Sequence, residues 1–69
     1  MKRYFEYVGG TSSKFWEITV KGSDVTTRYG RIGSAGRSTT KSFADGKGAK
    51  EFAEKIIGEK TTEGYKEKL

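Results

Sequence analysis

The middle of the chain carries positive charge without acids, and its residue types suit the binding of phosphate groups. Between positions 25 and 43 the basic residues are Arg28, Arg31, Arg37 and Lys41, and there is no Asp or Glu. The planar guanidinium of arginine forms paired hydrogen bonds to phosphate oxygens. The stretch therefore indicates an acidic partner, of which nucleic acid is the commonest. The alternative is that the charge only keeps the domain soluble.

The net charge of +5 is distributed unevenly along the 69 residues. Residues 1–43 hold eight basic and three acidic side chains, and residues 44–69 hold six of each. The whole excess, which includes Lys14, therefore lies in the N-terminal part of the chain.

Catalytic chemistry has little support in this composition. The chain has no Cys and no His, which excludes zinc sites of the Cys/His kind and nucleophilic catalysis by a Ser-His or Cys-His pair. Glu51, Glu54 and Glu59 alternate with lysines, as on a solvated helix face. A domain of this size has little room for a substrate pocket of about 300 Å³. We therefore expect a binding domain, not an enzyme, with no metal and no cofactor.

Length and hydropathy predict one small domain spanning residues 1–69. Only 32% of the residues are hydrophobic, and no apolar run approaches the roughly 18 residues of a membrane span. No signal peptide is visible at the N-terminus. We expect an intracellular, cytoplasmic protein without membrane partners, associated with the nucleoid if it is bacterial.

The first two thirds of the chain have the alternation and turn signals of antiparallel strands. Strands are predicted at residues 2–8, 14–21, 24–32 and 37–43, and the last is polar and suits a sheet edge. The polar edge favours a monomer. Gly22-Ser23 predicts a two-residue type II′ turn, which places Glu17 opposite Arg28 and Trp16 opposite Tyr29. The loop at residues 33–36 is interpreted as a hairpin loop; the less favoured alternative is an anion-binding nest.

The last third of the chain has the spacing of an amphipathic helix. Apolar residues recur at the i, i+3, i+4 positions from Ala49 to Ile57, Asp45 or Ser42 can cap the start, and Gly64 can end the helix. We predict an α+β fold with a small antiparallel sheet of four to five strands and this helix packed on one face. The expected core is Trp16, Phe52, Ile56 and Ile57. Phe15 alternates away from Trp16, so its burial stays open.

Residues 29–33 read Tyr-Gly-Arg-Ile-Gly, and with their surroundings they resemble the WGR domain. The aromatic strand at 14–18, the segment 41–43 and the segment 59–65 are also similar to this family, so the resemblance covers roughly residues 3–67. The tryptophan that names the family is Tyr29 here. Tyrosine keeps a flat ring that can stack, with less area.

The resemblance implies a DNA-binding role. WGR domains occur in DNA-dependent poly(ADP-ribose) polymerases, where they bind near strand breaks and signal to neighbouring domains. The signature aromatic ring packs on a sugar, the arginine lies at the junction with partner domains, and a lysine near the helix end approaches the backbone. By position these are Tyr29, Arg31 and Lys60. The catalytic domain of the polymerases has no counterpart in this sequence.

The sequence is compatible with three functions, and seven residues are candidates for nucleic-acid contacts. The first is the binding of double-stranded DNA at an end or nick, through backbone and sugar contacts. The second is a protein-interaction adaptor that uses the same surface, and the third is a binder of single strands or RNA that stacks bases on Tyr4, Phe5 and Tyr7. Tyr29 can instead pack on Trp16, and Arg28 can pair with Glu17. The candidate nucleic-acid contacts are Tyr29, Arg31, Lys60, Arg28, Arg37, Lys41 and Lys14.

Overall fold

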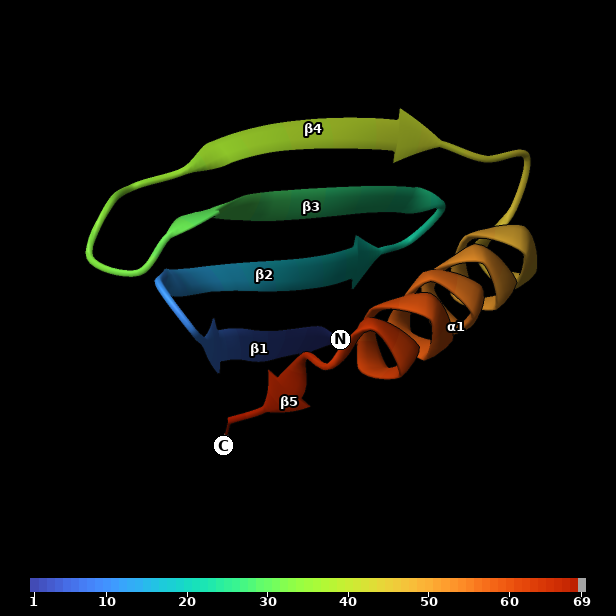
Figure 1. Cartoon of the computed structure of the whole chain (residues 1–69). Helices are drawn as coiled ribbons and strands as arrows, with labels where there is room; N and C mark the ends of the chain where they lie inside the picture. The colour runs from blue at the N-terminus through green and yellow to red at the C-terminus, as the bar shows by residue number, and fades with distance from the viewer. Residues whose placement is uncertain (69) are drawn as a thin grey trace.

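The computed structural model, which describes residues 1–68, contains a five-stranded sheet and one helix (Figure 1). The elements are β1 (Lys2–Gly9), β2 (Ser12–Lys21), β3 (Asp24–Arg31), β4 (Arg37–Ser42), α1 (Gly46–Glu63) and β5 (Lys66–Glu67). The strand order is β4-β3-β2-β1-β5, and every pair is antiparallel. The predicted α+β fold is confirmed, with the four predicted strands recovered to within two residues at each end.

The turn between β2 and β3 sets the register that positions the candidate residues. Gly22 has φ +62°, and no residue other than glycine has a positive φ among those described, which fits a type II′ turn with glycine first. Lys21 therefore pairs with Asp24, Glu17 with Arg28 and Trp16 with Tyr29, as predicted.

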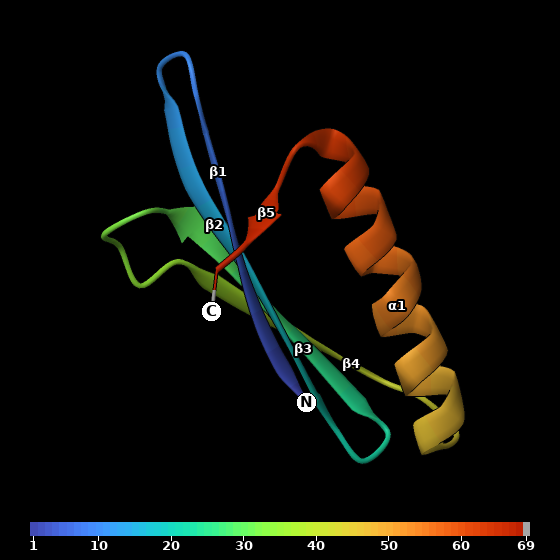
Figure 2. The same ribbon diagram turned by 90° about the horizontal axis from the view of Figure 1, so that it is seen from below.

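One face of the sheet packs against α1, and we call it the helix-side face; the other is the open face (Figure 2). Alternate residues of the central strands point to the helix-side face, where Phe5, Trp16, Ile18 and Val25 are buried. The helix contributes Ala49, Ala53 and Ile57 to this core. The two alanines let the helix backbone approach the sheet closely.

The helix ends form as the sequence predicts. The Asp45 carboxylate accepts a hydrogen bond from the Gly48 N–H at 2.8 Å, so Asp45 and not Ser42 is the N-cap. Gly64 ends the helix with φ +112°, and the next N–H, that of Tyr65, donates to the Lys60 carbonyl at 3.0 Å. This reversal folds Tyr65 back against the sheet, where its side chain is buried.

Two side chains differ from the expected core, and the open question of Phe15 is answered. Phe52 and Ile56, predicted as core, are only partly buried, because their side of α1 faces β4, a strand with every residue exposed. Phe15 is 2% exposed but lies on the open face, outside the main core. There it stacks on Tyr4, and Gly36 of the β3–β4 loop packs against its ring.

Candidate nucleic-acid interface

Lys14 and Arg31 are direct neighbours on adjacent strands at one end of the sheet. They are register partners on β2 and β3, two rows past the Trp16–Tyr29 pair, and therefore lie on the same face as that pair. Both residues are exposed. The alternation of the strands thus places three candidate residues, Lys14, Tyr29 and Arg31, on the helix-side face.

Lys60 joins them from the last turn of the helix through Tyr65. Its Nζ lies 5.5 Å from the centroid of the Tyr65 ring and 5.9 Å from that of Trp16. Lys14 Nζ lies 5.7 Å from the same Tyr65 ring and 5.0 Å from Tyr7. Tyr65 thus holds two ammonium groups by cation–π attraction. We call Lys14, Tyr29, Arg31 and Lys60 the basic cluster.

Tyr29 presents its ring to solvent. It is 43% exposed and takes no part in the aromatic pairs found among residues 1–68. The predicted register with Trp16 is correct, but the predicted aromatic pair is absent, because Trp16 packs on Phe5 at 5.5 Å instead. The Tyr29 ring is therefore free to stack on a ligand.

An open hollow of about 350 Å³ lies at the basic cluster, which is more space than the size of the domain led us to expect. Its lining combines cationic, aromatic and hydroxyl groups with backbone at Gly30. Hydroxyls and backbone N–H groups, together with arginine and lysine, are the groups that contact phosphates and sugars in protein–DNA complexes. The lining residues are Thr11, Ser12, Ser13, Lys14, Phe15, Tyr29, Gly30, Arg31 and Tyr65.

The charge of the basic cluster is largely uncompensated. The ion pairs among residues 1–68 are Lys2–Glu17, Arg3–Glu67, Arg28–Glu17 and Lys60–Glu63. Lys14 and Arg31 take part in none of them, and the Lys60–Glu63 contact is long, at 3.8 Å. An anion near the hollow would therefore meet two cations that have no acidic partner within the described part of the chain.

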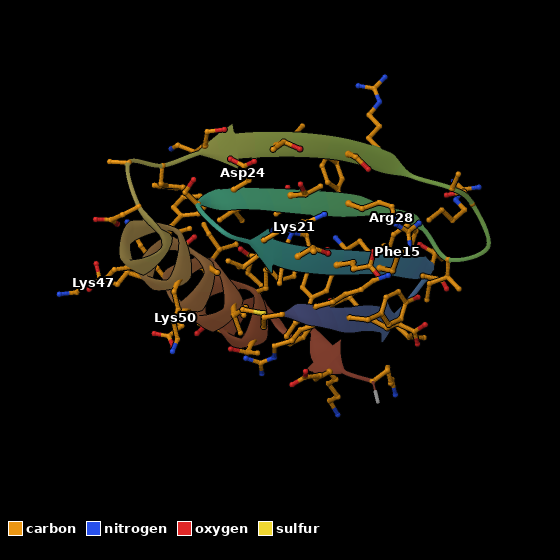
Figure 3. The ribbon with its side chains drawn as sticks, turned by 180° about the vertical axis from the view of Figure 1, so that it is seen from behind. Phe15, Lys21, Asp24, Arg28, Lys47 and Lys50 are labelled. Atoms are coloured by element: carbon orange, nitrogen blue, oxygen red, sulfur yellow. The ribbon has the colours of Figure 1, made fainter. Side chains whose placement is uncertain are left out.

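Arg28 lies on the open face, away from the basic cluster. Its Nε donates to Glu17 at 3.1 Å, its Nη1 donates to the Ala35 carbonyl at 2.8 Å, and its guanidinium lies 4.5 Å from the Phe15 centroid. Figure 3 labels Arg28 and Phe15 close together on neighbouring strands. The alternative role of Arg28, pairing with Glu17, fits this arrangement better than phosphate contact.

Arg37 and Lys41 lie on β4, on the helix-side face. Arg37 pairs in register with Tyr29, so it borders the basic cluster. Lys41 is further along the strand, where its Nζ lies 4.8 Å from the Phe52 centroid. The fold thus brings five of the seven candidates to one region and leaves Arg28 and Lys41 outside it.

The loop at residues 33–36 and the aromatic residues of β1 serve internal packing. The Arg31 carbonyl accepts hydrogen bonds from the Ser34 N–H at 3.0 Å and its hydroxyl at 2.7 Å, which fits the favoured hairpin loop. Phe5 is 1% exposed, so it cannot stack on a base as the third hypothesis requires. Tyr7 packs on Tyr65, and Tyr4 donates a hydrogen bond to Glu6. Burial and this bond raise the pKa of Tyr4.

Two contributors to the site do not follow from the sequence patterns. The helix end predicts that Tyr65 folds back, but its place between two lysines depends on the angle at which the helix crosses the sheet. Thr11 lies in the turn between β1 and β2, and Ser12 and Ser13 begin β2; no motif in the sequence marks their hydroxyls as contacts. A polar, glycine-bounded turn next to a basic strand end is the signal that could have indicated them.

Among residues 1–68, no group of three or more acidic side chains is arranged to hold a metal ion. In the same range, no helix is long and apolar enough to cross a bilayer.

Comparison with known proteins gives a consistent family assignment. Residues 1–69 match the family of the WGR domain. The chain is 37% identical over 67 residues to the uncharacterized Escherichia coli protein YfeS, covering 97% of the chain and 28% of YfeS. It is 35% identical over 65 residues to the Escherichia coli protein YehF, covering 94% of the chain and 24% of YehF.

A solved structure shares the fold of this chain. The crystal structure of a Bacteroides fragilis protein superimposes with a TM-score of 0.97 at 43% identity, covering 100% of this chain and 20% of that one. The chain therefore spans about a quarter of the length of the curated relatives it matches, and a fifth of the structural relative.

Proposed function

This chain belongs to the WGR domain family, and we propose that it binds DNA at ends or nicks through the basic cluster. The WGR domain is a nucleic-acid-binding module type in proteins related to poly(ADP-ribose) polymerases. The observation that carries the proposal is that Lys14 and Arg31 line one hollow together with the exposed Tyr29 ring, while Lys60 shares the Tyr65 ring with Lys14. The match to the WGR domain indicates no catalytic family.

The arrangement favours contacts to the sugar–phosphate backbone over contacts to base edges. A helix that reads bases in the major groove presents a basic surface to the DNA. The outer side of α1 instead mixes charges, and its exposed side chains include Lys47, Lys50, Glu51, Glu54, Lys55 and Glu59. Binding should therefore depend weakly on base sequence.

The proposed preference for ends and nicks rests on the exposed Tyr29 ring. A flat ring can pack on a sugar or base that a break in the duplex leaves uncovered, and such stacking contributes about 1–3 kcal/mol. Within an intact duplex the base faces are stacked, and each sugar is flanked by the next nucleotide of its strand. The three cations of the basic cluster supply attraction to any duplex, and its Tyr29 ring supplies the discrimination.

The test is fluorescence anisotropy with labelled blunt, nicked and intact circular duplex DNA. We expect nicked and blunt DNA to bind more tightly than the circle. With about three to five phosphate contacts, the slope of log K against log salt should lie near −3 to −4.5. Arg31→Ala should lower the affinity about tenfold, and the matched control Lys47→Ala, which removes one exposed charge from α1, less than about twofold.

Three results would contradict the proposal. A flat salt response would remove the role of the basic cluster in phosphate binding. Equal losses in Arg31→Ala and Lys47→Ala would show that net charge alone attracts DNA. Most DNA-binding proteins still bind DNA through phosphate contacts at about 100 mM salt. If this protein binds no DNA there, the adaptor function becomes the better explanation.

A further inference from the structure

The outer edge of β4 has no neighbouring strand among residues 1–68. β4 is the first strand of the sheet order and pairs only with β3, and all six of its residues are exposed (Figure 1). The opposite edge is different, because β5 is two residues long and Arg3 holds it through an ion pair with Glu67. Long, open edge strands are templates for pairing with another chain.

The register shows which backbone groups point outward from β4. The Phe43 N–H donates to the Ser23 carbonyl at 2.8 Å, so the hydrogen-bonded positions in this ladder are the odd-numbered residues of β4. The N–H and C=O groups of Ser38, Thr40 and Ser42 therefore point away from β3. They offer a complete set of donors and acceptors to a further strand.

The side chains next to this edge define what such a strand would carry. Arg37, Thr39 and Lys41 point to the helix-side face, and neither cation joins an ion pair within residues 1–68. Between β4 and α1 runs an apolar groove of about 200 Å³. Its lining residues are Trp16, Val25, Thr27, Thr39, Lys41, Phe52 and Ile56.

A second copy of this chain is disfavoured at the edge in the register centred on Thr39. In an antiparallel β4–β4 pair centred on Thr39, Arg37 of each copy lies directly opposite Lys41 of the other. Like charges directly opposite one another destabilise a sheet. The same two positions favour a strand with carboxylates, because each cation then gains a cross-strand partner.

We propose that the free edge of β4 binds an extended acidic segment of another protein, which adds a sixth strand to the sheet. The pattern that fits is acid–x–apolar–x–acid. The two acids lie opposite Lys41 and Arg37, and the central side chain, opposite Thr39, enters the groove over Phe52 and Ile56. Main-chain hydrogen bonds supply affinity and the alternate side chains supply specificity, as in other strand additions. The proposal does not depend on DNA binding, since it uses the edge of β4 and not the hollow.

The probe is a synthetic peptide with the sequence glutamate, threonine, leucine, threonine and glutamate, flanked by serines. It is titrated into ¹⁵N-labelled protein, and amide shifts are followed by NMR. We expect saturable shifts at Ser38, Thr40 and Ser42, with slowed exchange of these amides as they gain acceptors. A control peptide with the leucine moved by one position puts it on the open face, and should bind at least about threefold more weakly.

Variants of the protein test the backbone and the charge separately. Thr40→Pro removes an N–H that points outward, so it should abolish most peptide binding while the β3 ladder stays paired. Thr40→Ala loses the same hydroxyl contact to Thr26 but keeps the N–H, and should bind normally. Lys41→Glu should weaken binding about three- to tenfold, and Lys47→Glu, on the outer side of α1 (Figure 3), less than about twofold.

Each other outcome overturns the proposal. Shifts confined to Lys14, Tyr29 and Arg31 would mean that the peptide carboxylates occupy the hollow as anions. Shifts at β4 that depend on protein concentration without peptide would identify a second copy as the occupant. If millimolar peptide causes no shift, the edge of β4 does not bind extended acidic segments. None of these results changes the DNA titrations, so failure here and failure of DNA binding are distinguishable.

Discussion

Arg28 and Arg31 lie three positions apart on the same strand, and the two faces of the sheet give them different surroundings. On the open face, Arg28 has a carboxylate, a backbone carbonyl and an aromatic ring as partners. On the helix-side face, Arg31 has the cation of Lys14 as its register partner and no ion pair among residues 1–68. A guanidinium with satisfied donors stabilises the fold, whereas an exposed one without an acid is available to a ligand.

Position in the strand, and not residue type, therefore separates cations with internal partners from cations without an ion pair among residues 1–68. The side-chain period of two puts residues 28 and 31 on opposite faces. Glu17, the acid that neutralises Arg28, is itself fixed by the β2–β3 register. The expected consequence is that stability and DNA affinity respond to different arginines.

The largest expected effect comes from Gly36→Ala. Gly36 packs against both Phe15, whose ring lies on the open face, and the backbone of Tyr29, whose side chain lies on the helix-side face. A Cβ at Gly36 would lie 2.4 Å from the Tyr29 carbonyl oxygen and 2.7 Å from Phe15 Cζ, and the residue has φ +72°. The loop must move, which uncovers Phe15 and shifts the strand that carries Tyr29. We expect a loss of about 3 kcal/mol of unfolding free energy.

Urea unfolding followed by Trp16 fluorescence measures this loss. Gly33→Ala is the matched control, because Gly33 also has a positive φ, of +97°, but a Cβ added there would meet no atom within 4 Å. If Gly33→Ala loses as much unfolding free energy as Gly36→Ala, the effect comes from backbone strain and not from the contacts with Tyr29 and Phe15.

Arg28→Ala separates the two arginines directly. It removes the contacts to Glu17, Ala35 and Phe15 and leaves the half-buried Glu17 with only Lys2, at 3.7 Å, among the described residues. We expect a loss of about 1–2 kcal/mol of unfolding free energy, and DNA affinity within about twofold of wild type at temperatures where the variant is folded. Arg31→Ala should show the reverse, with stability unchanged to about 0.5 kcal/mol. If either variant lost both stability and DNA affinity, the two arginines would not have separate roles.

Tyr29→Trp tests whether the ring at position 29, on the helix-side face, stacks on the DNA break. The larger ring fits the exposed position and offers more stacking area than tyrosine. We expect a gain of about two- to fivefold in affinity for nicked DNA, roughly 0.4–1 kcal/mol, with no gain for intact duplex. Equal gains for both ligands would show that the ring contacts the duplex outside the break.

The smallest effect concerns a third arginine, Arg3, whose ion pair is exposed. Its Nε and Nη2 donate to both Glu67 oxygens at 2.8 and 2.7 Å, and this bond holds the pKa of Glu67 below its usual value of 4.5. Since the folded pKa is the lower one, the stabilisation is complete above the usual value and is lost as pH falls through the lowered pKa.

Glu67→Gln should therefore lower stability slightly at neutral pH and reduce the acid dependence below pH 4.5. Thermal melts of both proteins between neutral and acid pH measure the difference. Identical acid slopes in the two proteins would show that the pair contributes nothing.

The fold and the positions of the candidate residues could be predicted from the sequence because short turns determine them. A two-residue turn at Gly22 sets the β2–β3 register, and with it the pairing of Glu17 with Arg28 and the shared face of Lys14, Tyr29 and Arg31. These relations follow from the period of a strand and need no knowledge of packing.

Other features depend on how separate elements meet, and no local pattern encodes that. The helix crossing angle decides that Tyr65 lies between Lys14 and Lys60, and that Phe52 and Ile56 border an open groove instead of filling the core. The bond from Arg28 to the Ala35 carbonyl depends on loop conformation. A two-residue strand such as β5 is too short to show any alternation.

The place of β5 also affects the order in which the molecule assembles. Four strands form a meander whose contacts are local in sequence, which favours rapid hairpin formation. β5 pairs with β1, the most distant strand in the chain, and the Lys68 N–H reaches the Tyr4 carbonyl at 2.9 Å only after Gly64 has reversed the chain at the end of α1. The meander and the helix must therefore dock before this last edge closes, and the amide of Lys68 should be the latest to gain protection during refolding and among the first to lose it in native-state exchange.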